Sequence, residues 1–399
     1  MHTETLSLSD ARALALSSQF PVGQDLHGVI DRLGYIQIDT ISVVERAHHH
    51  VCWSRLPDYS PNDLQTLHSD KKQIFEYWAH AAAYVPMDDY RYYLPKMESF
   101  NNPREPWFRE RYARYGHLLG EVLDAIRSNG PMQAKDFESG AHLRGDWWDH
   151  KPAKGALELL FWRGELVVSG RKGFQRIFEL PERWLPSWVK TTRPGESETA
   201  RFQVNRALAA FGVATAGEIA RYLMLAPGEA INAALKAMVH EGIVETVKIH
   251  GLAGIPMFCA PQALKGPFTP PQAEKEVHIL SPFDNLLIQR RRTAWLFGFN
   301  YRLECYIPQK KREFGYFALP LLHDDRFAGI LDAKADRKAG RLIMKNLFLS
   351  EASLAQDLHF QHELAAAVSR FARFNRCTAI TIEQCNHPHL TPLFDTPAL

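Results

Sequence analysis

Apolar residues recur at helical spacing in two stretches of the chain that align with each other. Residues 157–166 (LELLFWRGEL) and 235–244 (LKAMVHEGIV) match at a constant offset of 78 residues, so the apolar positions coincide and Gly164 falls on Gly242. Shorter helices are predicted before each stretch, and a β-hairpin is predicted after it. A supersecondary unit that repeats at fixed spacing is a stronger signal than one copy. The pattern predicts two units of the form helix–helix–helix–hairpin.

The N-terminal hundred residues mix helices and strands. Ser7 or Ser9 can cap a first helix with Asp10 in its first turn, where the helix dipole favours an anion. A second helix should stop at Gly34, because glycine commonly ends helices. Beyond it the pattern predicts a strand, a helix and a strand at 35–44, 48–57 and 74–85.

The C-terminal part is richer in strands. Strands are predicted at 312–322, 327–336, 341–350 and 377–385, with one long helix at 361–374. The expected fold class is therefore α+β: tandem winged-helix (helix-turn-helix) units at 111–192 and 193–268, followed by a β-rich, barrel-like domain at 269–399.

Composition and charge narrow the class of protein. Of 399 residues, 46% are hydrophobic and 23% are charged, which excludes a disordered or low-complexity chain. The net charge of +2 excludes a polybasic tail as the main means of holding an acidic polymer, but it allows a basic face. Five cysteines without a CxxC pair indicate a reducing compartment. Neither a secretory signal nor a membrane span is evident, so we expect a soluble cytoplasmic protein with no membrane partner.

Gln37-Ile38-Asp39 is the first candidate for chemistry. On a strand Gln37 and Asp39 would share one face, with their Cα atoms about 6.5 Å apart. An amide and a carboxylate at that separation can hold a water or a sugar between them. From the pattern alone, the polar outer face of an edge strand is the simpler interpretation.

Several long strings make the chain resemble a known family. They are LSLSDARALAL (6–16), IQIDTI (36–41), FEYWAHAA (75–82), LSPFDNLL (280–287) and YRLECYIPQKKREFGYFALPLLHDDRFAGILDAKADRK (301–338). The chain resembles the bacterial AlkZ-like DNA glycosylases that unhook interstrand crosslinks, whose broader branch is called AlkX or YcaQ. Gln37-Ile38-Asp39 matches the Gln–hydrophobic–Asp signature of one branch.

The resemblance implies both an architecture and an activity. It implies a third winged-helix-like unit at 1–110 that carries the catalytic strand, and a C-shaped molecule with a concave DNA-binding surface. It also implies hydrolysis of the N-glycosidic bond of N7-alkylated guanine, as monoadducts and as nitrogen-mustard-type crosslinks, with Gln37 and Asp39 as catalytic residues. We expect a monomer that acts on double-stranded DNA at the nucleoid, without a cofactor.

Glycosidic chemistry accounts for these residue types. An N7-alkylguanine is already cationic, so one carboxylate can suffice where ordinary glycosidases use two. Asp39 would stabilise the oxocarbenium-like sugar and orient or deprotonate the attacking water, and Gln37 would fix that water and the sugar. A lyase step needs an amine nucleophile, and no lysine lies beside the motif in the sequence. We therefore expect a monofunctional enzyme that leaves an abasic site.

Other residues are weaker candidates for contact with DNA or the lesion. The arginine run and the predicted wing tip carry charge suited to phosphates, although both also fit a solvated surface. The candidates are His48, His49, His50, His80, Arg171, Lys172, Asp284, Arg290, Arg291 and Arg292. Cys385, His387 and His389 lack a second ligand pair at zinc-finger spacing, so we expect a terminal turn and no metal.

A non-catalytic winged-helix DNA-binding or transcription regulator is the alternative function. A protein that recognises base edges usually has a basic recognition helix, whereas residues 156–164 and 233–242 are mostly apolar. A protein that only binds DNA also has no need of the Gln37/Asp39 pair. A metal-dependent nuclease, a third interpretation, lacks an obvious carboxylate cluster.

Overall fold

The computed structural model describes residues 4–102, 104–137, 150–252, 254–265, 268 and 276–394, with the backbone alone at 150 and 151. Helices and several β-sheets alternate along this part of the chain, so the predicted α+β class is confirmed. None of its helices is both long and apolar enough to span a bilayer.

The N-terminal part opens with a capped helix. The side chain of Ser7 accepts the amide of Asp10 at 3.1 Å, and Asp10 accepts the amide of Ser7 in return at 2.9 Å. The second helix stops at Gly34, whose φ of 71° is the left-handed conformation that glycine adopts without strain. The elements are β1 (Glu4–Leu6), α1 (Leu8–Gln19), α2 (Leu26–Leu33), β2 (Ile36–Gln37), α3 (Ala47–Trp53), α4 (Pro61–Gln65), the π-helix η1 (Thr66–Asp70), β3 (Ile74–Trp78), β4 (Ala82–Pro86), η2 (Met87–Asp89) and α5 (Tyr90–Ser99).

The middle of the chain contains the repeat. Both aligned helices bury their apolar face, end at a glycine in the left-handed region (Gly164, φ 73°; Gly242, φ 70°) and lead into an antiparallel hairpin. The elements are α6 (Pro106–Tyr115), η3 (Gly116–Leu118), α7 (Leu119–Asn129), η4 (Ala134–Phe137), α8 (His150–Trp162), β5 (Val167–Lys172), β6 (Gln175–Glu179), α9 (Pro181–Trp184), α10 (Glu196–Phe211), β7 (Val213–Ala214), α11 (Ala216–Leu223), α12 (Gly228–His240), β8 (Glu245–Ile249), β9 (Met257–Cys259) and η5 (Pro261–Leu264).

The C-terminal part is a five-stranded sheet in the order β10-β11-β12-β13-β14, and all its pairs are antiparallel except β13–β14. In the part of the chain that is described, β10 and β14 each pair with one strand, so these pairs form an open sheet. The elements are β10 (Val277–Ile279), α13 (Arg290–Phe297), η6 (Glu304–Tyr306), η7 (Gln309–Lys311), β11 (Ala318–His323), β12 (Arg326–Asp336), β13 (Arg341–Leu349), α14 (Ala352–Gln356), α15 (Leu358–Phe374), β14 (Ala379–Ile382) and η8 (Pro388–Leu393).

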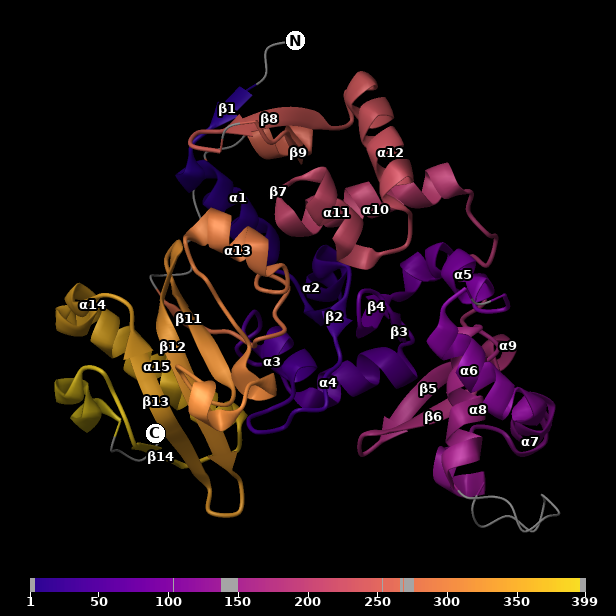
Figure 1. The fold of residues 1–399 in the computed structure, drawn as a ribbon. Helices are drawn as coiled ribbons and strands as arrows, with labels where there is room; N and C mark the ends of the chain where they lie inside the picture. The colour runs from indigo at the N-terminus through magenta and orange to yellow at the C-terminus, as the bar shows by residue number, and fades with distance from the viewer. Residues whose placement is uncertain are drawn as a thin grey trace.

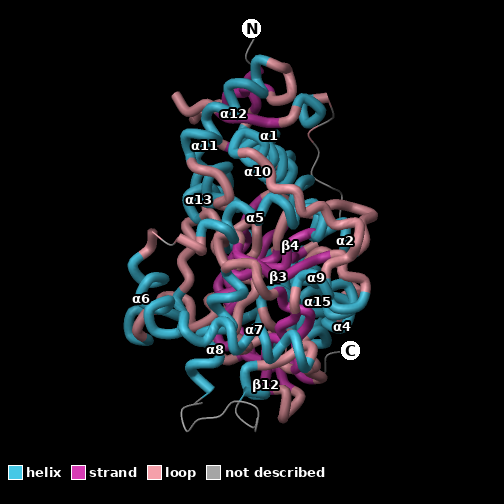
Figure 2. Tube along the Cα trace, turned by 90° about the vertical axis from the view of Figure 1, so that its right-hand side faces the viewer, coloured by secondary structure: helices cyan, strands magenta, loops and turns pink. Residues whose placement is uncertain are grey.

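These parts form an arch. In Figure 1 the β11–β14 sheet with α15 makes one leg, β5 and β6 with α6, α7 and α8 make the other, and β1, β8, β9 and α12 lie at the top. The short strands β2, β3 and β4 lie between the legs. Figure 2, turned by 90°, shows β3 and β4 near the middle of the molecule, below α10 and α1.

Segments from the first fifty residues tie the arch together. β1 pairs in parallel with β8, so Leu6 lies beside Ile249, while the carbonyl of Val43 accepts the amide of Ala335 in β12 at 2.8 Å. The predicted unit 1–110 is thus distributed over contacts with two other parts. The predicted boundary after residue 268 borders 269–275, which lie outside the described residues.

Two predicted strands differ most from the structure, and a third, predicted at 312–322, begins only at Ala318. Residues 74–85 form the hairpin β3–β4, with Trp78 opposite Ala82, because alternation alone does not distinguish one strand from two strands joined by a tight turn. Residues 35–44 contribute only the two-residue strand β2. Beyond it the chain leaves β4 and crosses to the C-terminal sheet, so no neighbouring strand is there to continue the pairing.

Candidate active site

Gln37 and Asp39 lie where β2 ends. The last backbone contact of this strand is the amide of Ile38, which donates to the carbonyl of Ala82 at 2.8 Å. Asp39 follows at once, at the start of the loop that leads to α3. Gln37 is buried, with 8% of its surface exposed, while Asp39 is only partly buried. A rigid sheet therefore holds the amide, and the carboxylate stands at the sheet's edge.

The carboxylate of Asp39 has one oxygen held and one oxygen open. Oδ1 accepts the amide of Ile41 at 2.7 Å, and within the described residues Oδ2 has no hydrogen bond. Partial burial raises the pKa of Asp39 above its ordinary value, and the hydrogen bond from Ile41 offsets part of that rise. A carboxylate with a raised pKa accepts a proton more readily than a solvated one, as a general base must.

His80, at the turn between β3 and β4, fixes the amide of Gln37. Its Nε2 lies 3.0 Å from Oε1 of Gln37. Burial, aided by the nearby charge of Lys96, lowers the pKa of His80 to about 4, so the ring is neutral at pH 7. With its proton on Nε2, the tautomer assigned here, His80 donates to Gln37. The amide hydrogens of Gln37 then find no acceptor among the described residues and remain available.

A lysine that the sequence did not indicate lies near His80. Lys96, on α5, donates from Nζ to the carbonyls of Trp78 at 3.0 Å and Ala79 at 2.8 Å. Burial lowers the pKa of Lys96 to about 8. No lysine is near the motif along the sequence, but in the fold one lies next to His80. Only the packing of α5 against the hairpin reveals it, since no sequence motif links them.

The loop after Asp39 reaches the C-terminal part. Ser42 and Val43 line a cleft of about 700 Å³ together with residues 309, 312–316 and parts of β12 and β13. The turn η6 is close enough that the charge of Asp39 contributes, after burial, to a raised pKa of Cys305 and Tyr306. The candidate site thus lies at the junction of two sheets.

The three consecutive histidines have different polar surroundings, although the rings of His48 and His49 contact each other at 4.3 Å between centroids. His50 is buried and its Nε2 lies 2.9 Å from the carbonyl of Ile279, which fastens α3 to β10. His49 bonds to the hydroxyl of Tyr59 at 2.6 Å. His48 is buried, and burial lowers its pKa well below the ordinary value. His48 and His50 are thus enclosed by protein groups, which leaves little of them to face DNA, whereas His49 is half-buried.

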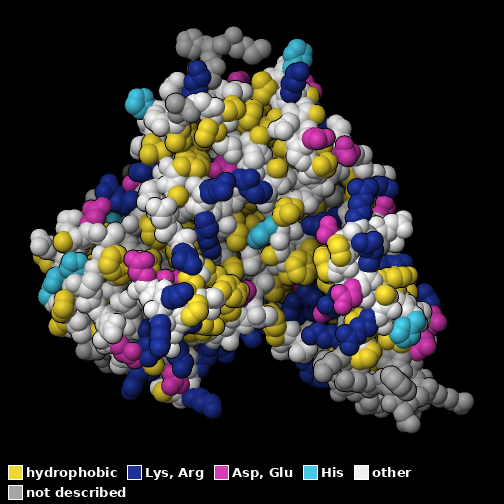
Figure 3. Space-filling view, in the orientation of Figure 1, with side chains coloured by type: hydrophobic (Ala, Val, Ile, Leu, Met, Phe, Trp, Pro, Cys, Tyr) yellow, Lys and Arg dark blue, Asp and Glu magenta, His cyan; other side chains and the backbone are white. Residues whose placement is uncertain are grey.

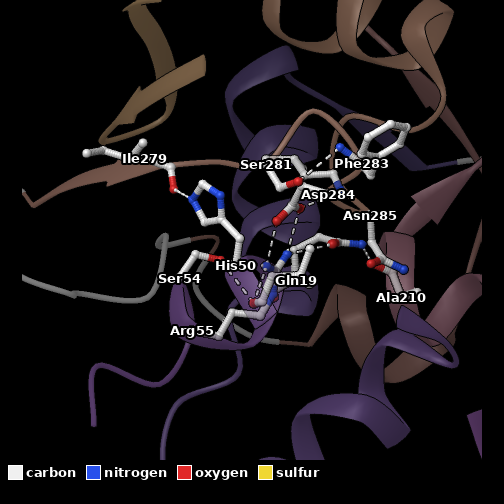
Figure 4. Close-up of polar contacts among 12 residues, drawn as sticks. Gln19, His50, Ser54, Arg55, Ala210, Ile279, Ser281, Phe283, Asp284 and Asn285 are labelled. Carbon is white, nitrogen blue, oxygen red and sulfur yellow. Dashed lines mark hydrogen bonds and ion pairs between the residues drawn. The ribbon is translucent and has the colours of Figure 1, made fainter. Parts of the chain in front are cut away.

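Asp284 lies inside the protein, away from any surface that a lesion could reach. Its two oxygens accept both ends of the Arg55 guanidinium, at 2.7 and 2.8 Å, and neither side chain is exposed (Figure 4). The neighbouring Asn285 donates to the carbonyl of Tyr35 and to the hydroxyl of Tyr222, both at 3.0 Å. The SPFDNLL segment therefore joins the N-terminal part to the rest of the arch.

The basic candidates divide into enclosed and exposed side chains. Arg292 is buried against Glu218, and Arg290 donates to two backbone carbonyls, whereas Arg291 is exposed. At the tip of the β5–β6 hairpin, Arg171 pairs with the buried Glu76, and Lys172 is exposed. Of these charges, Arg291 and Lys172 remain open to a phosphate. Figure 3 shows Lys and Arg side chains on both walls of the notch between the legs of the arch.

Clusters suited to a metal are absent from the described residues, where His, Cys, Asp and Glu form no group of three or more. His389 instead bonds the carbonyl of Ala355 at 2.9 Å, and Cys385 contacts the backbone of His387.

A comparison with known protein families shows the family of this chain. The model of the AlkZ-like DNA glycosylases matches residues 30–374, a span that includes Gln37, Asp39 and His80. The chain belongs to the AlkZ-like DNA glycosylase family. As an AlkZ-like protein it is a glycosylase, a hydrolase of N-glycosyl bonds with DNA as substrate, and the resemblance found in the sequence is confirmed.

A solved structure agrees with the fold. This AlkZ-like chain is similar to Streptomyces sahachiroi DNA glycosylase AlkZ, with a TM-score of 0.64 over 95% of this chain and 100% of that one. The two sequences are 16% identical, so this likeness shows a common fold.

Proposed function

We propose that this AlkZ-like glycosylase removes N7-alkylated guanine from duplex DNA, both as monoadducts and as interstrand crosslinks. The observation that carries the proposal is the open oxygen of Asp39, two residues along the chain from Gln37, whose amide hydrogens are unused within the described residues. One carboxylate and one amide suit a leaving group that needs no protonation. A cationic N7-alkylguanine is such a group, whereas an unmodified base would require a separate acid.

The reaction is a hydrolysis at C1′ of the deoxyribose. The bond from C1′ to N9 breaks, and its electron pair leaves with the alkylated guanine, which becomes neutral. Asp39 stabilises the positive charge that develops on the sugar and accepts the proton of the water that attacks C1′. Gln37 donates a hydrogen bond to that water or to the sugar, and His80 keeps its amide in the orientation that permits this.

The position of the site supports the crosslink activity. A base tied to the opposite strand cannot rotate into a closed pocket, as glycosylases usually require. Asp39 lies in a loop at the junction of two sheets, and the notch between the legs of the arch is open in Figure 3. We propose that the helical units at 1–110, 111–192 and 193–268 act as winged helices that bind backbone and shape, with a single chain supplying the whole site.

We propose that the enzyme is monofunctional. A lyase needs a free amine to form a Schiff base, and a lysine with a depressed pKa is suited to this. Lys96 has such a pKa, but its Nζ donates to two backbone carbonyls, and the described residues show no contact between it and Gln37 or Asp39. Borohydride trapping of the protein on abasic DNA should give no covalent complex. A complex that disappears in Lys96→Arg would show a lyase.

An excision assay tests the proposal. A duplex that contains N7-methylguanine or a nitrogen-mustard crosslink is incubated with the protein, and alkali then cleaves the abasic sites. Asp39→Asn should still bind DNA but should excise about 10²–10⁴-fold more slowly, the usual contribution of a general base. Asp58→Asn, which changes an exposed aspartate, is the matched control. Wild-type rates in Asp39→Asn, or no scission by the wild type, would overturn the proposal.

A further inference from the structure

Tyr306 is an aromatic side chain left open to solvent. It is 77% exposed, more than any other large aromatic residue that the structure describes as exposed; the next are Trp188 at 53% and Trp107 at 46%. Leaving so much aromatic surface in water forgoes the stability that its burial would give. Tyrosine is enriched at binding interfaces, because its ring is apolar and its hydroxyl tolerates water.

The turn that carries Tyr306 is held rigidly. The carboxylate of Glu304, 3% exposed, accepts the amides of Glu313, Phe314 and Gly315 at 2.8–3.1 Å. Such an array of charge-assisted hydrogen bonds ties η6 to the backbone of residues 313–315. The exposed ring is therefore presented from a fixed frame rather than from a loose loop.

The second anchor is Asp332 of β12. Its oxygens accept the amides of Tyr316 and Phe317, both at 3.0 Å. A Cβ on Gly315 would come within 1.9 Å of the same carboxylate, so only glycine permits this close approach. The segment from 304 to 317 is thereby clamped to β12, the central strand of the C-terminal sheet.

This clamped segment faces the candidate site and is basic. Residues 309 and 312–316 line the same cleft as Ser42 and Val43, and the charge of Asp39 adds, after burial and Cys305, to the raised pKa of Tyr306. Lys310 and Lys311 are exposed on η7 just beyond the ring. An aromatic platform next to positive charges is the arrangement that proteins use to stack on unpaired bases while holding the phosphates.

We propose that Tyr306 stacks on a nucleobase next to the nucleotide being excised, and that Lys310 and Lys311 bind the adjoining phosphates. The inference rests on the proposed function for the position of the lesion. The stacked ring of Tyr306 would hold the duplex open beside Asp39. The ring face, not the hydroxyl, makes this contact, so phenylalanine should replace tyrosine.

Binding to product-like DNA tests the inference without excision. The probe is a duplex with a tetrahydrofuran abasic analogue, and affinity is measured by fluorescence anisotropy over a range of salt. Tyr306→Leu should bind about 5- to 100-fold more weakly, the loss expected for one stacked base. Its slope of log affinity against log salt should not change, because the ring neutralises no phosphate. Lys310→Ala should instead lower that slope by about 0.9.

The controls separate stacking from other effects. Tyr306→Phe should bind like the wild type, and so should Tyr112→Leu, which removes an exposed tyrosine on α6. The inference is overturned if Tyr306→Leu binds within about twofold of the wild type, or if Tyr306→Phe loses as much affinity as Tyr306→Leu. A protein that binds through Tyr306 but releases no alkylated guanine would support the inference and overturn the proposed function. If the protein excises alkylated guanine but Tyr306→Leu leaves its DNA affinity unchanged, the proposed function is supported and the inference is overturned.

Discussion

Replacing Asp284 by asparagine should weaken the fold and leave the chemistry intact. Asp284 and Arg55 pair at 2.7 and 2.8 Å with neither side chain exposed, and the pair joins α3 to the segment before α13. Asparagine keeps the shape and one acceptor oxygen, but it removes the negative charge. The guanidinium of Arg55 is then left buried without a counter-charge.

The size of the effect follows from this burial. Each hydrogen bond to a charged group contributes about 1.5–3 kcal/mol, and removing one partner of a buried pair costs about 3–5 kcal/mol. We expect Asp284→Asn and Arg55→Met each to lower the free energy of unfolding by about 3–5 kcal/mol. The double variant should lose less than the sum by about 1–3 kcal/mol, because it leaves no unpaired charge in the interior.

Urea unfolding followed by tryptophan fluorescence measures the loss, and single-turnover excision on the folded fraction measures the chemistry. Asp58→Asn again serves as the exposed control. A destabilisation below about 1 kcal/mol would refute the argument from burial. So would a loss of excision at unchanged stability, which would give Asp284 a direct role at the lesion.

Further predictions concern the candidate active site, the dependence of excision and stability on pH, and the dependence of DNA binding on salt. His80→Ala should slow excision by up to about tenfold at unchanged DNA affinity, because it removes one hydrogen bond from Gln37. The excision rate should fall as pH drops through the raised pKa of Asp39, since the protonated carboxyl accepts no proton, and a pH–rate profile without this acid limb would contradict the role. Lys172→Ala and Arg291→Ala should each lower the salt slope of DNA binding by about 0.9, and an unchanged slope would exclude a phosphate contact. The free energy of unfolding should fall as pH drops from about 6.5 to 4. Over this range histidines bind protons in the unfolded chain, whereas histidines of lowered pKa stay neutral in the folded chain. Thermal unfolding at pH 7 and 5 would check this effect, which we expect from His50, His68, His80 and His278.

Local signals predicted the elements that depend on local physics. The cap at Ser7, the stop at Gly34 and the repeated helix with its hairpin follow from neighbours a few residues apart, and all are present. The strand predicted at 35–44 is much shorter in the structure, because a strand exists only where another strand pairs with it. Its partner β4 lies almost fifty residues away and covers only its beginning.

The sequence by itself determined the α+β class and the family, because both follow from local periodicities and from long characteristic strings, and it singled out Gln37 and Asp39 as the candidates for catalysis. Tertiary structure alone decided which oxygen of Asp39 is open, that His80 bonds Gln37 and that Lys96 lies near His80. It also placed Asp284 inside and Tyr306 outside, although both occur in equally recognisable segments. The physical reason is that burial and partners arise from contacts between residues distant along the chain, and these set the charge state and reach of each side chain.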